Sequence, residues 1–118
     1  MILVDTSVWI DHLRKGHRGL VALLEAGEVL VHPFVAGELA CASLRNRAAF
    51  LALLEALPGA TVATHDEAMS FLETHRLAAR GLGYVDVHLL ATAHLDRCRL
   101  LTLDRRLARA AARLRVAA

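Results

Sequence analysis

The chain has 118 residues, of which 56% are hydrophobic and only 4% aromatic, and its formal net charge is +2. This length suits one domain with a real core and is too short for two, so we expect residues 1–118 to form a single domain. A core with so few aromatic residues must be built from Leu, Val and Ala, and such a core suits helices packed on a small sheet.

The sequence favours a cytoplasmic protein. No apolar stretch is long enough to span a bilayer, and no charged segment precedes an apolar one at the start, as a signal peptide would require. Cys41 and Cys98 lie among apolar residues. We therefore expect both to be buried free thiols in a reducing compartment.

The basic residues are almost all arginine, with Lys15 as the single lysine. The planar guanidinium group matches the oxygens of phosphate, so a phosphate-bearing partner is one interpretation of this excess. A bias in the composition of the source genome would produce the same excess.

Strands and helices are expected to alternate along the whole chain. An apolar run that ends on Asp5 predicts a buried strand, and Thr64 followed by Glu67 is the capping-box pattern that starts a helix. The predicted strands are Ile2–Val4, Val29–His32, Thr61–Ala63 and Arg99–Leu103, and the predicted helices are Val8–Lys15, Arg18–Ala26, Phe34–Ser43, Arg47–Leu57, Thr64–His75, Tyr84–Leu95 and Asp104–Arg113. Elements of these lengths imply parallel pairing and an α/β sandwich.

Four of the twelve acidic residues stand in apolar surroundings. Asp5 follows Ile-Leu-Val, Glu38 lies inside a mostly apolar helix, Asp86 is flanked by two valines, and Asp104 follows Leu-Leu-Thr-Leu. The other eight have polar neighbours or lie at helix ends, where solvent explains them. A carboxylate at an apolar position is costly unless its charge is compensated, and the chain offers no matching set of buried bases.

Helix capping is the structural alternative for three of these acids. Asp5 and Asp104 fall at strand-to-helix junctions, and Asp86 lies near the start of its helix, where a negative charge is also favoured. Glu38 is in mid-helix and has no partner four residues away. Taken together, two strand ends and two helix segments can converge at one edge of a parallel sheet, where open α/β folds bind their ligands.

Four carboxylates gathered in one pocket would repel one another unless a cation lay between them. Oxygen ligands suit Mg²⁺ or Mn²⁺ rather than zinc, and the histidines and cysteines show no zinc-ligand spacing, so we expect the histidines at the surface. Thr6, Ser7 and Thr102 carry short hydroxyl groups that could hold a carboxylate or a metal-bound water. Helix capping and strand propensity account for them equally well.

Four short motifs follow one another in a characteristic order. They are Val-Asp5-Thr6-Ser7-Val-Trp9-Ile, His32-Pro33-Phe34 leading to Gly37-Glu38-Leu39-Ala40, Gly83-Tyr84-Val85-Asp86-Val-His-Leu-Leu-Ala, and Leu101-Thr102-Leu-Asp104-Arg-Arg. In this order they resemble a PIN-domain ribonuclease, and most closely a VapC-type toxin of a bacterial toxin–antitoxin system. The resemblance covers essentially the whole chain.

This resemblance implies a three-layer α/β/α sandwich around a small central parallel sheet. It also implies a metal-dependent endoribonuclease with an acidic Mg²⁺ or Mn²⁺ pocket, a homodimer, and inhibition by a cognate VapB-like antitoxin. Asp5, Glu38, Asp86 and Asp104 match the acidic quartet of the family. Thr6 or Ser7 matches the hydroxyl beside its first acid, and Thr102 the polar position two before its fourth.

Two features leave alternatives open. Arg105, Arg109 and Arg113 recur at four-residue spacing and are candidates for RNA contact, although a solvated helix face explains the same stripe. Trp9 is expected in the core or a dimer contact rather than as a base-stacking platform.

Other functions fit the sequence less well than a nuclease. A receiver domain needs a lysine at a late strand end, and a haloacid-dehalogenase phosphatase needs an Asp where Ser7 stands. A noncatalytic PIN-fold module that binds RNA or a protein is the remaining alternative.

Overall fold

The computed structural model describes all 118 residues. Its sheet has three parallel strands, β1 (Ile2–Val4), β2 (Val29–Leu30) and β3 (Arg99–Leu101), in the order β2-β1-β3. Ile2 lies opposite Val29 on one side and opposite Arg99 on the other. The parallel pairing predicted from the sequence is therefore confirmed, and β1 lies at the centre of the sheet.

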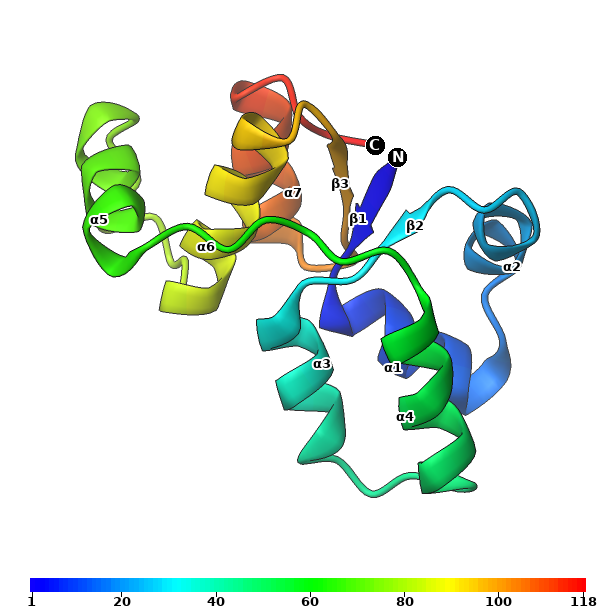
Figure 1. Ribbon diagram of the computed structural model, residues 1–118. Helices are drawn as coiled ribbons and strands as arrows, with labels where there is room; N and C mark the ends of the chain where they lie inside the picture. Colours follow the sequence, from blue (N-terminus) through cyan, green and yellow to red (C-terminus); the bar gives the residue numbers. More distant parts are fainter.

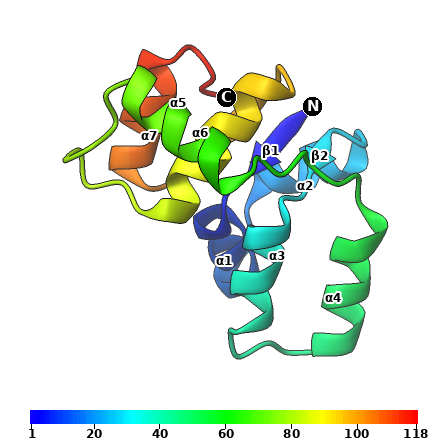
Figure 2. The ribbon, with the colours of Figure 1, turned by 60° about the vertical axis from the view of Figure 1, so that its left-hand side comes forward.

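Seven helices surround this sheet. They are α1 (Thr6–Lys15), α2 (Arg18–Glu25), α3 (Pro33–Ala40), α4 (Arg47–Ala56), α5 (His65–Thr74), α6 (Tyr84–Leu95) and α7 (Arg105–Arg113). Figures 1 and 2 show α5, α6 and α7 gathered on one side of the strands, and α2, α3 and α4 on the other. This is the α/β sandwich that the alternating elements predicted.

The core is built around β1 and α6. Every residue from Val87 to Ala93 is buried, so the middle of α6 is covered on all sides, as an apolar helix segment next to a sheet should be. Trp9 on α1 is fully buried and meets Phe50 of α4 edge to face, with ring centroids 5.8 Å apart. The expectation that Trp9 belongs to the core is confirmed.

The predicted strand Thr61–Ala63 is wrong. The chain instead pairs two residues earlier, where Val31 forms a parallel bridge with Gly59. The polar groups of Thr61 are taken by α6 and its C-cap, because its N–H donates to Asp96 Oδ2 at 2.9 Å and its carbonyl accepts the Thr92 hydroxyl at 2.7 Å. Without free backbone groups there, residue 61 cannot extend the sheet.

The strand predicted at Arg99–Leu103 is shorter than expected, because β3 ends at Leu101. Its outer edge pairs with the last residues of the chain, through a bridge between Leu100 and Ala117. Leu100 N–H donates to Val116 O at 2.7 Å, and Ala118 N–H donates to Leu100 O at 2.9 Å. No local pattern in the sequence indicates this pairing, which partly covers an exposed sheet edge.

Helix starts follow local chemistry. The predicted capping box is present, since Thr64 N–H donates to Glu67 Oε1 at 2.9 Å and Glu67 N–H donates to Thr64 Oγ1 at 3.1 Å. These two hydrogen bonds lower the pKa of Glu67. The helix α3 ends at Ala40, three residues before the predicted end at Ser43.

Two expectations about burial were wrong in part. Cys98 is buried, and burial raises the pKa of its thiol, but Cys41 follows the end of α3 and is exposed. His32 and His88 are buried, at 0% and 1% exposed, whereas all histidines were expected at the surface. His32 caps α3, with Nδ1 accepting the Phe34 N–H at 3.0 Å, and its ring packs edge to face against Phe34.

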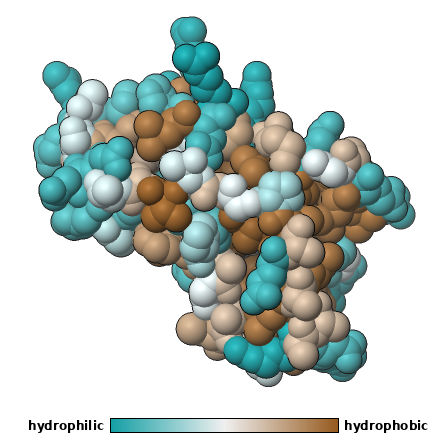
Figure 3. Space-filling model, viewed as in Figure 1, coloured by the Kyte–Doolittle hydropathy of each residue, from teal (hydrophilic) through white to brown (hydrophobic).

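The surface is mixed in character. In Figure 3 apolar residues gather across the centre of the visible face, and hydrophilic residues cover the end formed by α5. No helix is both long enough and apolar enough to cross a bilayer.

Candidate active site

The four acids that sequence reasoning singled out lie around one edge of the sheet. Asp5 directly follows β1 and Asp104 lies just after β3, so both are carried by the carboxyl ends of adjacent parallel strands. Glu38 is on α3 and Asp86 is in the first turn of α6. Burial raises the pKa of Asp86, and the negative charges of Asp5, Asp104 and Glu38 raise it further, so each of these three carboxylates lies close enough to Asp86 to repel its charge.

Asp5 is the most buried of the four, at 7% exposed. Its Oδ2 accepts two hydroxyl groups, from Ser7 Oγ at 2.7 Å and from Thr102 Oγ1 at 2.7 Å. It makes no capping bond to α1, although it occupies the N-cap position. The capping alternative therefore fails for Asp5. Both hydroxyls donate to Oδ2, and Oδ1 accepts no hydrogen bond from the protein.

The two hydroxyls are themselves held by the backbone. Ser7 Oγ accepts the Leu103 N–H at 3.0 Å, and Thr102 Oγ1 accepts the Asp104 N–H at 3.0 Å. Because each oxygen receives a backbone proton, each hydroxyl proton is directed to Asp5. This network ties the start of α1 to the segment after β3 and fixes the orientation of the Asp5 carboxylate.

Thr6 serves a different acid. Its hydroxyl donates to Glu38 Oε1 at 2.8 Å, which links α1 to α3. Glu38 lies on the exposed part of α3, so its carboxylate is open to solvent as well as to Thr6. Of the three hydroxyl residues predicted for the site, Thr6 therefore donates to Glu38, and the other two donate to Asp5.

Capping holds for the remaining two acids, but each uses only one oxygen. Asp86 Oδ2 accepts the Gly83 N–H at 2.9 Å, and Asp104 Oδ1 accepts the Leu107 N–H at 3.0 Å. The second oxygen of each carboxylate has no hydrogen-bond partner in the protein. Asp86 is half-buried and Asp104 is exposed. Capping therefore orients these side chains without using up their capacity as ligands.

The donors fit a hard divalent cation in their chemistry. All are carboxylate or hydroxyl oxygens, and a cation would relieve the repulsion that raises the pKa of Asp86. No three carboxylate, imidazole or thiolate groups stand close enough to hold one ion as the side chains lie. Glu38, Asp86 and Asp104 would therefore have to turn toward Asp5 to complete a coordination shell.

The arginine stripe differs in detail from the prediction. Arg109 and Arg113 line one depression on α7, together with Arg106, which lies near the predicted stripe, and Arg80, which the sequence did not indicate. Arg105 lies outside it. Arg106 shares a face with Arg109 and Arg113, because residues three and seven apart on a helix lie on the same side.

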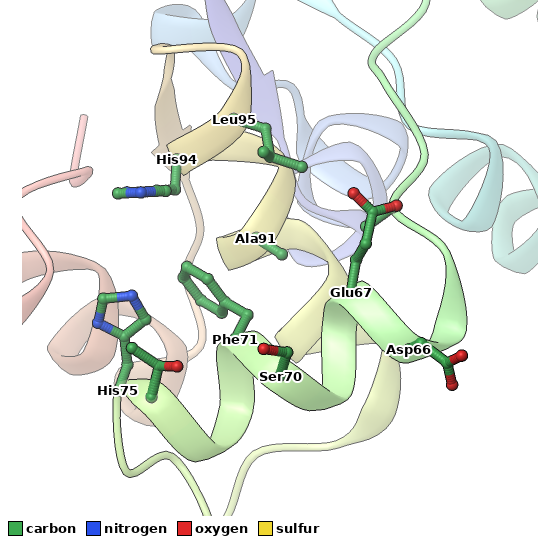
Figure 4. Close-up of a pocket in the computed structure, with 10 residues that line it drawn as sticks. Asp66, Glu67, Ser70, Phe71, His75, Ala91, His94 and Leu95 are labelled. Carbon is green, nitrogen blue, oxygen red and sulfur yellow. The ribbon is translucent and has the colours of Figure 1, made fainter.

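A separate depression of about 480 Å³ lies between α5 and α6, and none of the four acids lines it. Figure 4 shows Phe71, His75 and His94 at one end, with Asp66 and Glu67 toward the other. The rings of Phe71 and His75 have centroids 4.4 Å apart. This depression shares no lining residue with the acidic site.

Comparisons with known proteins bear on this site. A family model of the PIN domain matches residues 2–113. Ribonuclease VapC32 of Mycobacterium tuberculosis, known from strains CDC 1551 / Oshkosh and ATCC 25618 / H37Rv, is 48% identical over 118 residues, covering 99% of this chain and 95% of the relative. The crystal structure of PAE2754 from Pyrobaculum aerophilum aligns with a TM-score of 0.67 and 18% identity, over 92% of this chain and 83% of that one. The structural likeness shows a shared fold.

Proposed function

The chain belongs to the PIN-domain family and is a homologue of Ribonuclease VapC32, and we propose that it is a metal-dependent endoribonuclease, the toxin of a type II toxin–antitoxin module. The observation that carries this proposal is the setting of Asp5. It is a buried carboxylate whose orientation is fixed by two hydroxyls and whose Oδ1 is left open, at the same edge of the sheet as three further acids. A purely structural Asp at this position would cap α1, and Asp5 does not.

The cation we propose is Mg²⁺ or Mn²⁺, held by Asp5, Glu38, Asp86 and Asp104. Bound there, it would supply Lewis acidity to the scissile phosphate and to the attacking water. Ser7 and Thr102 hold Asp5 in one orientation, so that this ligand is ready before the substrate arrives. Thr6 holds only Oε1 of Glu38, so Oε2 can still turn toward the cation.

The assay that tests the function is RNA cleavage in Mn²⁺ by the wild-type chain and by Asp5→Asn. We expect the wild type to cut structured RNAs. The variant should lose more than the ~10–100-fold that is typical for removing a group that only supports a metal ligand. Fragments mapped by end sequencing would identify the sites of cleavage.

Asp11→Asn is the matched control for this experiment. It makes the same change on the neighbouring helix α1, at a residue whose contact is an ion pair with Lys15 at 3.4 Å. It should cleave like the wild type. If wild type and Asp5→Asn leave the RNA pool equally intact, the nuclease proposal fails and the noncatalytic binding module takes its place.

The proposal extends to partners. We infer a homodimer that acts on RNA in the cytoplasm and is inhibited by a cognate VapB-like antitoxin. The support is the relationship to Ribonuclease VapC32, which covers nearly the full length of both chains. Expression of the chain alone should halt growth, and co-expression of a small neighbouring reading frame should relieve the arrest.

A further inference from the structure

Four arginines line a depression of about 340 Å³ beside α7. Arg106, Arg109 and Arg113 come from this helix, and Arg80 comes from the segment that follows α5. The only other lining residues are Ala79 and Ala110. Figure 2 shows the segment after α5 passing along α7. The residues that line the depression come from these two parts of the chain.

None of these four guanidinium groups is neutralised by the protein. The only ion pair in the structure joins Lys15 to Asp11, on α1. No acidic residue lines the depression. Like charges that converge on one hollow repel one another, so the arrangement favours an anion that fills it.

Two of the four arginines are held in place by backbone carbonyls. Arg80 Nε donates to Arg76 O at 2.7 Å, and Arg113 Nη2 donates to His75 O at 2.8 Å. Arg106 lies close against Gly81, where an added Cβ would come within 2.6 Å of Arg106 Cδ. The absence of a side chain at Gly81 therefore lets Arg106 reach this position. A hollow with partly fixed guanidinium groups loses less side-chain entropy on binding than a freely solvated face.

The helix explains which arginines face the hollow. Arg106, Arg109 and Arg113 are spaced by three and four residues and share one face of α7, whereas Arg105 lies about 100° around the helix from Arg106. Both segments that line the hollow are close in sequence to residues of the acidic site. Arg106 follows Asp104 by two residues, and Gly81 precedes by two residues the Gly83 whose N–H holds Asp86.

We propose that this depression is a second phosphate-binding subsite, which holds a backbone phosphate of the RNA strand beyond the one that is cleaved. The inference rests on the proposed function and adds to it the path of the substrate along α7. Guanidinium groups bind phosphate oxygens with paired hydrogen bonds. The lining contains only arginine and alanine, with no aromatic ring to stack on a base, so the subsite positions the strand without reading its sequence.

A binding assay tests the subsite apart from cleavage. In an Asp5→Asn background, the affinity for a short fluorescein-labelled single-stranded RNA is measured by anisotropy over a range of KCl concentrations. Arg106→Gln combined with Arg109→Gln should weaken binding and reduce the slope of log K against log [salt] by about 0.7 for each phosphate that the protein no longer neutralises. Arg80→Gln, on the other wall and outside any helix, should act in the same direction.

The matched control is Arg18→Gln, which makes the same change of charge at the start of α2, away from the hollow. It should leave the salt slope unchanged, and a thermal melt should show that every variant folds. The proposal is overturned if the α7 double variant and Arg80→Gln keep the slope of the Arg18 control. It is also overturned if a glutamate-rich peptide displaces the RNA at equal concentration, since the hollow would then serve an acidic protein segment.

The two proposals fail in different ways. If the wild type cuts no RNA but the salt slope falls in the arginine variants, the nuclease proposal fails, and the hollow remains a phosphate-binding site of a noncatalytic RNA-binding module. If the wild type cuts RNA and the slope does not fall, the subsite fails and the nuclease stands.

Discussion

At the scale of single residues, the site depends on which hydroxyl supports which carboxylate. The sequence predicted Thr6, Ser7 and Thr102 as a group, because short hydroxyl residues stand beside Asp5 and before Asp104. It could not assign them, since the pairing depends on the approach of β3 to β1, which brings Thr102 within 2.7 Å of Asp5 across 97 positions of sequence. That contact is tertiary and leaves no local signal.

Removing one of the hydroxyls that hold Asp5 should lower the metal-dependent cleavage rate more than it lowers the stability of the fold. For Thr102→Val we expect a loss of about 10–100-fold in cleavage rate at limiting Mn²⁺, because Asp5 is then held by Ser7 alone. Rates measured over a series of Mn²⁺ concentrations check this, with Thr102→Ser as the control that keeps the hydroxyl. A rate for Thr102→Val equal to wild type at every metal concentration would show that the hydroxyl does not orient the ligand.

At the scale of elements, the sequence predicted the positions of the acids because the helices and strands that carry them have clear local patterns. Tyr84–Leu95 was predicted to the residue and is α6. The strand at Thr61–Ala63 failed because Asp96 and Thr92 take the backbone groups of Thr61, and their approach is fixed only by packing. The same limit hid the pairing of Leu100 with Ala117.

The double use of Asp104 gives a prediction at this scale. Asp104 caps α7 through Oδ1 and is also proposed as a metal ligand. Asn caps a helix as well as Asp does, so Asp104→Asn should keep the stability of the fold while lowering the cleavage rate. Asp104→Ala should lower the cleavage rate and also cost about 1 kcal/mol of unfolding free energy.

Urea unfolding and cleavage rates, measured on the same preparations, separate these two roles. If Asp104→Asn cleaves like the wild type, the residue is a cap and no more. If Asp104→Asn loses as much stability as Asp104→Ala, the charge of the carboxylate, rather than its hydrogen bond, supports the helix.

At the scale of the whole molecule, two buried histidines link the two sides of the fold. His32 ends the segment after β2 and His88 lies on α6, and their ring centroids are 6.3 Å apart, with Phe34 between the two elements at 4.9 Å from His32 and 4.7 Å from His88. Nε2 of His32 has no hydrogen-bond partner. The contact therefore joins the β2–α3 side of the molecule to the α6 side through neutral rings.

This contact makes the stability of the fold depend on pH. Burial, with His88 nearby, lowers the pKa of His32 to about 4, from 6.5 for an unperturbed histidine. Below pH 6.5 the unfolded chain takes up a proton that the folded chain excludes, so stability falls as the pH drops from 6.5 toward 4 and is fully present above that window. Between about pH 7 and about pH 5 this amounts to about 2 kcal/mol. His32→Asn keeps an acceptor at the start of α3, and its urea midpoint should change less over the same interval than that of the wild type. An equal loss in both proteins would place the pH dependence elsewhere in the molecule.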